Sequence, residues 1–295
     1  MTRRIVVLVL VLVALTLGGL LFVAIAPHGN PGIAIEQNLA YGKGGDTDLL
    51  LDLAMPKAGE GPFPAVMFVH GRGWREGSRR DMSHFIEGMA GLGYVGVTID
   101  YRLVPAAHFP AQVEDCKAAV RWLRANAAKY RIDADHIGVV GFSAGGHLAS
   151  MLGVTGPGDG LEGNGGNPGQ STRVQAVVSF FGPTDFSTRD WPTDLEREVI
   201  VPFLGGTVAE RPDTYRKASP YTYATKDAPP FLFFHGSEDE LVPVDQSRRM
   251  ADKLKVDGVP VQLVVLAGER HGFSDASNQK AMRQMLDFLG ERLRK

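Results

Sequence analysis

The strongest constraint on the fold is a series of short apolar segments that alternate with amphipathic ones. Most of the apolar segments are continuous runs with the length of buried strands. Strands buried on both faces belong to mostly parallel sheets, whose crossover connections are usually helical. The strand candidates are 48–56, 63–71, 93–102, 136–143, 174–182, 230–236 and 261–268, and the helix candidates are 110–129, 144–153, 245–257 and 277–293. The sequence therefore predicts an α/β fold with a mostly parallel central sheet and helices on both faces.

The length of 295 residues suits one large domain better than two small ones. We place this domain at 45–295, preceded by a linker and first strand region at 27–44. Residues 183–229 are too long for a simple crossover, so we expect a small lid or insertion beside the site. The glycine-rich segment 155–171 predicts a mobile surface loop.

The N-terminus carries a targeting signal. Arg3 and Arg4 precede an uncharged apolar run at 5–26, which is long enough to cross a bilayer. Two interpretations of 1–26 stay open, an uncleaved membrane anchor and a cleaved secretory signal. Both export the rest of the chain, because the positive flank stays in the cytoplasm. The domain is thus expected outside the cytoplasm, either membrane-anchored or secreted or periplasmic.

Composition excludes several other classes of protein. The 31 Lys and Arg against 33 Asp and Glu leave a net charge of −2, which gives no argument for a nucleic-acid partner. The single cysteine, Cys116, cannot form a disulfide within the chain, and no Cys/His cluster has the spacing of a zinc site. We expect neither a metal nor an organic cofactor, and the oligomeric state stays open.

A serine between glycines follows one of the strand candidates. Residues 141–145 read Gly-Phe-Ser-Ala-Gly, and they lie between the strand 136–143 and the helix 144–153. A sharp strand-to-helix turn of this pattern raises the serine hydroxyl above the sheet, at the positive end of the helix. This context predicts that Ser143 is a nucleophile.

A serine hydroxyl needs a base, and the base needs an acid to orient it. His271 lies just after the last strand candidate and is the predicted base, whereas His70, His147 and His235 have more ordinary structural roles to fill. The loop after 230–236 offers Glu238, Asp239 and Glu240. We take Asp239 as the acid, with Glu238 as the alternative.

The reaction also needs donors for the oxyanion. One is the backbone N–H of Ala144, directly after the nucleophile. The others are expected in the loop at 71–73, which is Gly71-Arg72-Gly73, because backbone donors there must approach the substrate closely.

These motifs together resemble the α/β-hydrolase family, in particular esterases and lipases whose oxyanion loop reads His-Gly-Gly-Gly-Trp. Among them the likeness is closest to bacterial acetyl-xylan and feruloyl esterases. The shared segments, spread over 45–295, are "FVHGRGWREG", "DYRL", "GFSAGGHLA", "FFGPTDF", "HGSEDELVPVDQS" and "GERHGF". The resemblance implies an α/β-hydrolase fold, Ser143, Asp239 and His271 as catalytic triad, and oxyanion amides from Arg72, Gly73 and Ala144.

Arg72 departs from the pattern, since relatives usually have glycine there. Its side chain either points away from the pocket and is neutral, or projects into it and favours an anionic or sugar-bearing ester. The aromatic residues near the strand ends are candidates for the pocket wall, with plain core packing as the alternative for each. They are Trp74, Phe142, Phe181, Trp191 and Phe273.

The predicted reaction is therefore hydrolysis of a small ester through a covalent acyl-enzyme. An amide or peptide hydrolase on the same fold is the nearest alternative. An exported binding protein that has lost catalysis is less compatible with a complete triad. A lipase with a long apolar lid is less compatible with the polar segment 187–199.

Overall fold

The computed structural model describes residues 32–188 and 190–294. Their centre is an eight-stranded sheet in the order β1-β2-β4-β3-β5-β6-β7-β8. The strands are β1 (Ile33–Gly44), β2 (Thr47–Pro56), β3 (Phe63–Val69), β4 (Val95–Ile99), β5 (Ile132–Phe142), β6 (Ala176–Phe180), β7 (Phe231–Gly236) and β8 (Val261–Leu266).

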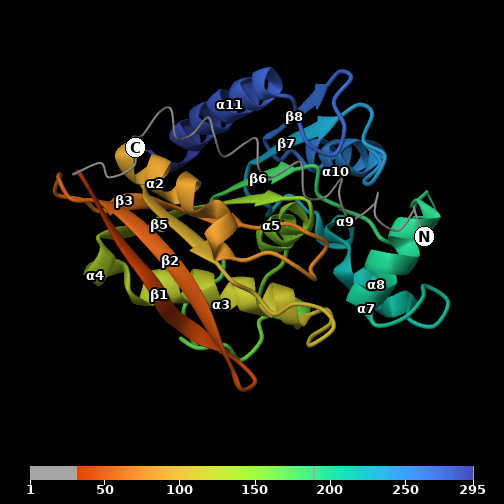
Figure 1. Ribbon diagram of the computed structural model, residues 1–295, viewed down its shortest axis with the longest axis horizontal. Helices are drawn as coiled ribbons and strands as arrows, with labels where there is room; N and C mark the ends of the chain where they lie inside the picture. The colour runs from red at the N-terminus through yellow and green to blue at the C-terminus, as the bar shows by residue number, and fades with distance from the viewer. Residues whose placement is uncertain (1–31, 189, 295) are drawn as a thin grey trace.

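The sheet is mixed only at its β1 end. β1 pairs with β2 antiparallel and β2 pairs with β4 antiparallel, whereas β3 to β8 all pair parallel with one another. The predicted, mostly parallel α/β sheet is confirmed. The β1–β2 hairpin projects beyond the parallel part of the sheet (Figure 1).

Helices cover both faces, as expected for strands that are apolar on both sides. The longer ones are α2 (Ser83–Gly91), α3 (Ala111–Ala125), α5 (Ala144–Val154), α10 (Asp245–Val256) and α11 (Asp275–Leu293). The shorter ones are η1 (Arg79–Met82), α4 (Ala127–Tyr130), η2 (Pro157–Asp159), α6 (Thr193–Leu195), η3 (Glu196–Ile200), α7 (Val201–Leu204), α8 (Pro212–Ala218) and α9 (Pro220–Tyr223).

Two hydrophobic cores lie on the two faces of the sheet. One core packs α2 and α11 against residues such as Val140 and Phe234. The other packs α3, α5 and α10 against residues such as Val139 and Phe233. Figure 1 shows α2 and α11 on one side of the sheet and α3 on the other. Neighbouring strand residues thus enter opposite cores, which leaves the strand ends free to carry the site.

The glycine-rich segment 155–171 is held more firmly than the sequence predicts. Glu162 accepts hydrogen bonds from Lys117 Nζ at 2.7 Å and from Arg121 Nη1 at 3.2 Å. The side chain of Lys117 is fully buried, and Leu161 is buried too. The segment lies at the surface as expected, since most of its residues are exposed or partly exposed, but it is anchored at Glu162 because a buried cation on α3 requires the carboxylate that this segment supplies.

The predicted anchor or signal at 1–26 lies outside the described residues. Within 32–188 and 190–294, no helix has the length and apolar character needed to cross a bilayer. In the same ranges, no group of three or more His, Cys, Asp or Glu side chains is arranged to hold a metal ion.

Candidate active site

The turn between β5 and α5 displays Ser143. Its backbone adopts φ 53° and ψ −117°, a strained conformation for a residue with a side chain, and its N–H donates to Phe180 O at 2.8 Å. Gly141 and Gly145 flank it because neither position has space for a side chain. A Cβ on Gly141 would overlap the Gly145 carbonyl, and one on Gly145 would overlap the Val69 carbonyl. The turn can therefore close only with glycine at both places.

The structure brings together the three residues predicted as the triad. Ser143 Oγ lies 2.8 Å from His271 Nε2, and His271 Nδ1 lies 2.8 Å from Asp239 Oδ2. The residues come from the β5–α5 turn, the loop after β8 and the loop after β7. Since these loops follow parallel strands, they meet at one edge of the sheet. A nucleophile, a base and an orienting carboxylate are thus in hydrogen-bond contact.

The Asp239 carboxylate is fully buried and held at both oxygens. Oδ1 accepts hydrogen bonds from the N–H groups of Leu241 and Val242, each at 2.9 Å. Burial raises the pKa of Asp239, but His271 and His235 stabilise its negative charge, and the net effect is a pKa well below the usual value. Asp239 is therefore ionised at neutral pH and can stabilise an imidazolium at His271.

A pocket of about 620 Å³ opens above Ser143, within the size range of small-molecule sites. Its wall is formed by the β5–α5 turn, the loop after β8, the loop after β3, the insertion between β6 and β7, and the loop after β7. The residues are Arg72, Gly73, Trp74, Arg75, Glu76, Ser143, Ala144, Pro183, Trp191, Asp194, Leu195, Arg197, Glu198, Val199, Ile200, Leu241, Val242 and His271. Sequence reasoning named seven of these and missed the charged and aliphatic residues of 194–200.

The insertion packs directly on the predicted oxyanion loop. Arg75 Nη1 donates to the Glu198 carbonyl at 2.8 Å. A Cβ on Gly73, whose φ is +62°, would lie 2.9 Å from Val199 Cγ1. Gly73 and Ala144 both line the pocket beside Ser143, whereas Gly71 does not and instead faces the Phe142 carbonyl.

Two of the five predicted aromatic residues line the pocket. Trp74 and Trp191 do, and both are nearly buried. Phe142, Phe181 and Phe273 instead belong to the core that α2 and α11 cover, so assigning them to the pocket was incorrect. Side chains alternate along a strand, and Phe142, next to the displayed serine, points into that core. The ring centroid of Phe181 lies 4.7 Å from that of His271, so Phe181 packs against the imidazole of the base.

Arg72 lies in the left-handed region with a φ of 67°, as do Gly73 and Trp74 after it. Its Nε is 3.5 Å from Asp81 Oδ2, which directs the guanidinium toward η1. The structure thus favours the interpretation in which the side chain turns away from the substrate. Arg72 itself lines the pocket, and the backbone N–H at this position is one that every residue type except proline supplies.

Replacing Arg72 with glycine is expected to raise the free energy of unfolding by roughly 0.5–1 kcal/mol. A left-handed residue with a side chain costs about 1–2 kcal/mol, part of which the larger entropy of unfolded glycine offsets. Urea unfolding measures the change, and kcat/KM on a neutral ester should stay within about threefold because glycine keeps the N–H. A selective loss on an ester with an anionic acyl group would instead support a side chain that projects into the pocket.

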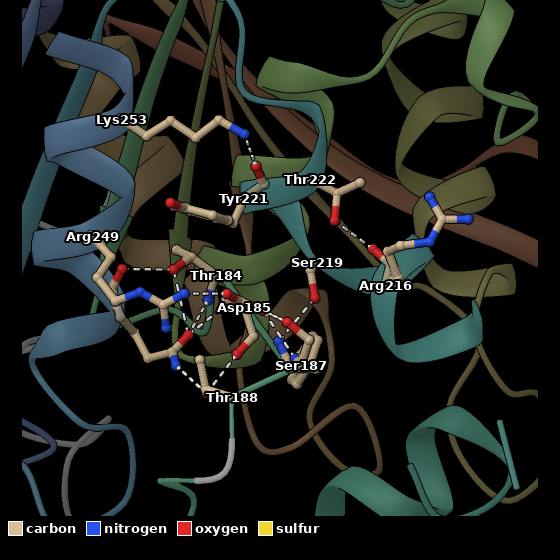
Figure 2. A network of polar contacts seen from close by, with 12 residues as sticks. Thr184, Asp185, Ser187, Thr188, Arg216, Ser219, Tyr221, Thr222, Arg249 and Lys253 are labelled. Carbon is tan, nitrogen blue, oxygen red and sulfur yellow. Dashed lines mark hydrogen bonds and ion pairs between the residues drawn. The ribbon is translucent and has the colours of Figure 1, made fainter. Parts of the chain in front are cut away.

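The base of the insertion is tied to α10 by a network of polar contacts (Figure 2). Arg249 on α10 pairs with the buried Asp185 at 2.5 Å, and Lys253 donates to the Tyr221 carbonyl at 2.6 Å. Ser219 Oγ accepts the N–H of Phe186 at 2.8 Å, which joins the two ends of the insertion. The pocket wall at 191–200 therefore rises from a fixed base.

Two other buried histidines near the site, His147 and His70, are structural. His147 on α5 contacts the Ala218 carbonyl through Nε2 at 2.7 Å, and His70 stacks on Tyr101. Burial lowers the pKa of each to about 4, so both are neutral at pH 7. Both rings are buried and engaged by other groups. The histidine in contact with Ser143 Oγ is His271, which is therefore the base.

A parallel sheet with a serine displayed between strand and helix, joined to a histidine and an aspartate at the strand ends, defines an α/β-hydrolase. A family model described as BD-FAE matches residues 51–254. The chain belongs to this family.

Curated relatives from Mycobacterium tuberculosis are named as esterases. The chain is 37% identical to esterase LipC over 219 residues, which is 72% of this chain and 53% of LipC. It is 34% identical to LipM, a probable carboxylic ester hydrolase, over 88% of this chain and 61% of LipM. The chain thus spans little more than half the length of these relatives.

Solved structures with the same fold are also esterases. A carbohydrate esterase from gut microbiota, in truncated form, superposes with a TM-score of 0.77 at 30% identity, covering 89% of this chain and 97% of that one. Esterase 2 of Thermogutta terrifontis, phosphonylated by sarin, superposes with a TM-score of 0.76 at 27% identity, covering 90% and 97%. The same esterase with propionate bound superposes with a TM-score of 0.74 at 29% identity, covering 90% and 96%.

Proposed function

We propose that the protein is a serine hydrolase that cleaves carboxylic esters of small molecules through a covalent acyl-enzyme. The observation that carries the proposal is the unbroken contact from Ser143 through His271 to Asp239 at the floor of the pocket. Relatives named as esterases over most of this chain support an ester as the substrate. An amide substrate finds no comparable support.

In the proposed mechanism, His271 Nε2 removes the Ser143 proton as Oγ attacks the ester carbonyl. The tetrahedral oxyanion forms beside Ala144 and Gly73, whose backbone N–H groups are the proposed donors. The imidazolium at His271 is stabilised by Asp239 and then protonates the leaving alcohol. Water repeats these steps on the acyl-enzyme and releases the acid. No step requires a metal or an organic cofactor.

The lining of the pocket supports a substrate with an apolar portion and a polar end. Trp191, Leu195 and Ile200 supply apolar surface from the insertion. Charged groups come both from the loop after β3 and from the insertion itself: Arg75, Glu76, Asp194, Arg197 and Glu198. Such a mixture suits an ester with a short acyl chain better than a long lipid chain, because charged groups at the wall would be left unsolvated by a lipid.

Labelling with a fluorophosphonate probe tests the proposal. We expect one adduct per chain, located on Ser143 by peptide mapping, and hydrolysis of p-nitrophenyl acetate that is lost in proportion to labelling. Protein unfolded by heat before labelling serves as the control, since the serine is activated only in the folded site. An adduct on another residue, or none on a folded and soluble protein, would refute the proposed mechanism.

We further propose that residues 1–26 export the domain, either as a membrane anchor or as a cleaved signal. The positive pair Arg3 and Arg4 before an uncharged apolar run supports this localisation. Cell fractionation tests it: activity that stays in the cytoplasm of intact cells would contradict it.

A further inference from the structure

A second imidazole lies against the acid of the triad. His235, the residue before the last one in β7, places Nε2 at 3.2 Å from Asp239 Oδ2 and at 2.8 Å from the Val242 carbonyl. Its Nδ1 lies 2.7 Å from Ser247 Oγ on α10. All three side chains of His235, Asp239 and Ser247 are buried. The polar chain from Ser143 to Asp239 therefore continues, away from the pocket, for two more residues.

The contacts determine which nitrogen of His235 carries the proton. A carboxylate oxygen and a carbonyl oxygen accept hydrogen bonds and cannot donate them, so Nε2 must carry a hydrogen. The Val242 carbonyl is its nearer acceptor at 2.8 Å, and Asp239 Oδ2 is the longer contact at 3.2 Å. In the neutral ring, Nδ1 is then an acceptor, and the hydroxyl of Ser247 donates to it. The hydroxyl thus holds the ring in the tautomer that donates to Asp239.

The second donor completes the fixation of the Asp239 carboxylate. The two backbone N–H groups of Leu241 and Val242 hold Oδ1, whereas the triad contact with His271 Nδ1 is the hydrogen bond at Oδ2. His235 Nε2 places a donor at Oδ2, the same atom that accepts from His271 Nδ1. His235 therefore lies against the same carboxylate oxygen that orients the His271 ring.

We propose that His235, oriented by Ser247, is a positioning residue that holds the triad carboxylate in the geometry required by His271. The proposal rests on the proposed hydrolase function. Neither residue lines the pocket, so their action on the reaction passes through Asp239.

The test compares two substitutions of His235 by their effects on kcat and KM. Glutamine keeps an N–H donor near the position of Nε2, whereas leucine removes it. We expect His235→Leu to lower kcat about tenfold or more with KM within about twofold, because a misplaced catalytic group costs rate and not binding. His235→Gln should recover kcat to within about threefold of the unsubstituted protein.

Ser247→Ala provides a second, milder test that does not depend on the folding of His235→Leu. We expect kcat to fall about threefold or more, since the imidazole loses the hydroxyl that orients it. Ser150→Ala is the matched control, because Ser150 is a buried helix serine whose Oγ donates to the Gly146 carbonyl at 2.8 Å and contacts no triad residue. It should lose similar stability in thermal unfolding and keep its kcat.

The outcomes separate the inference from the function on which it rests. If the unsubstituted protein hydrolyses esters and Ser247→Ala, His235→Leu and His235→Gln all keep its kcat, the inference is wrong. The inference would also be overturned if His235→Leu and His235→Gln lost kcat equally and their melting temperatures fell in proportion. Such a result would mean that His235 acts only through packing. Absence of turnover and of labelling in the unsubstituted protein would refute the proposed function instead.

Discussion

Replacing Ser143 with alanine is expected to lower kcat for ester hydrolysis by about 10⁶-fold, because the acyl-enzyme can no longer form. The change removes one hydroxyl, whose contact with His271 Nε2 is 2.8 Å long. Alanine meets the same backbone demand at φ 53° as serine does, so the fold should be kept. The measurement is kcat on p-nitrophenyl acetate, with protein that has passed through affinity and size-exclusion steps to remove host esterases.

Two controls make the Ser143→Ala result specific. Ser150→Ala, on the helix α5 that follows Ser143, should keep the kcat of the unsubstituted protein. Thermal unfolding of Ser143→Ala should occur within a few degrees of the unsubstituted protein, because a single partly exposed hydrogen bond contributes about 1 kcal/mol. A loss of less than about tenfold in a folded variant would show that the chemistry belongs to another residue.

Much of the fold could be predicted because its signals are local. Each apolar run of strand length becomes a strand of the sheet, and the serine between glycines stands at the β5–α5 turn. Ser143, Asp239 and His271 follow three different strands, and parallel pairing brings such strand ends to one edge. Knowledge of strand order was not needed to name them, because the residue type and position after a strand were sufficient.

The rest of the site depends on contacts between distant segments, which no local pattern encodes. The insertion places Val199 against Gly73 and Glu198 against Arg75, although more than a hundred residues separate the pairs. The contact between His235 and Asp239 joins residues only four positions apart, but it depends on the shape of the turn after β7, which is held by two backbone hydrogen bonds to the carboxylate itself. The alternation of side chains along a strand, by contrast, is a local signal that could have excluded Phe142 from the pocket.

Replacing Asp239 with asparagine is expected to lower kcat by about 10⁴-fold at neutral pH while leaving the fold intact. Every neighbour of the carboxylate is a donor: two backbone N–H groups face Oδ1, and His271 Nδ1 and His235 Nε2 face Oδ2. An amide has only one acceptor oxygen. If the amide oxygen accepts from the backbone N–H groups of Leu241 and Val242, the NH₂ group faces the two imidazoles.

The expected loss then follows from the tautomer of His271. An NH₂ group at the Oδ2 position donates to Nδ1, which moves the imidazole hydrogen to Nε2. His271 can then no longer accept the Ser143 proton, so the nucleophile stays inactive although all three residues are in place. Labelling by the fluorophosphonate probe should slow in parallel with kcat.

The control for Asp239→Asn is Asp133→Asn. Asp133 makes the same kind of contact, with Oδ2 at 2.8 Å from His136 Nδ1, but it lies at the opposite end of β5 from Ser143. We expect this control to keep kcat within about twofold. A kcat for Asp239→Asn near that of Asp133→Asn would mean that Asp239 is not the anionic partner of the base, and the acid would have to be sought elsewhere, first at Glu238.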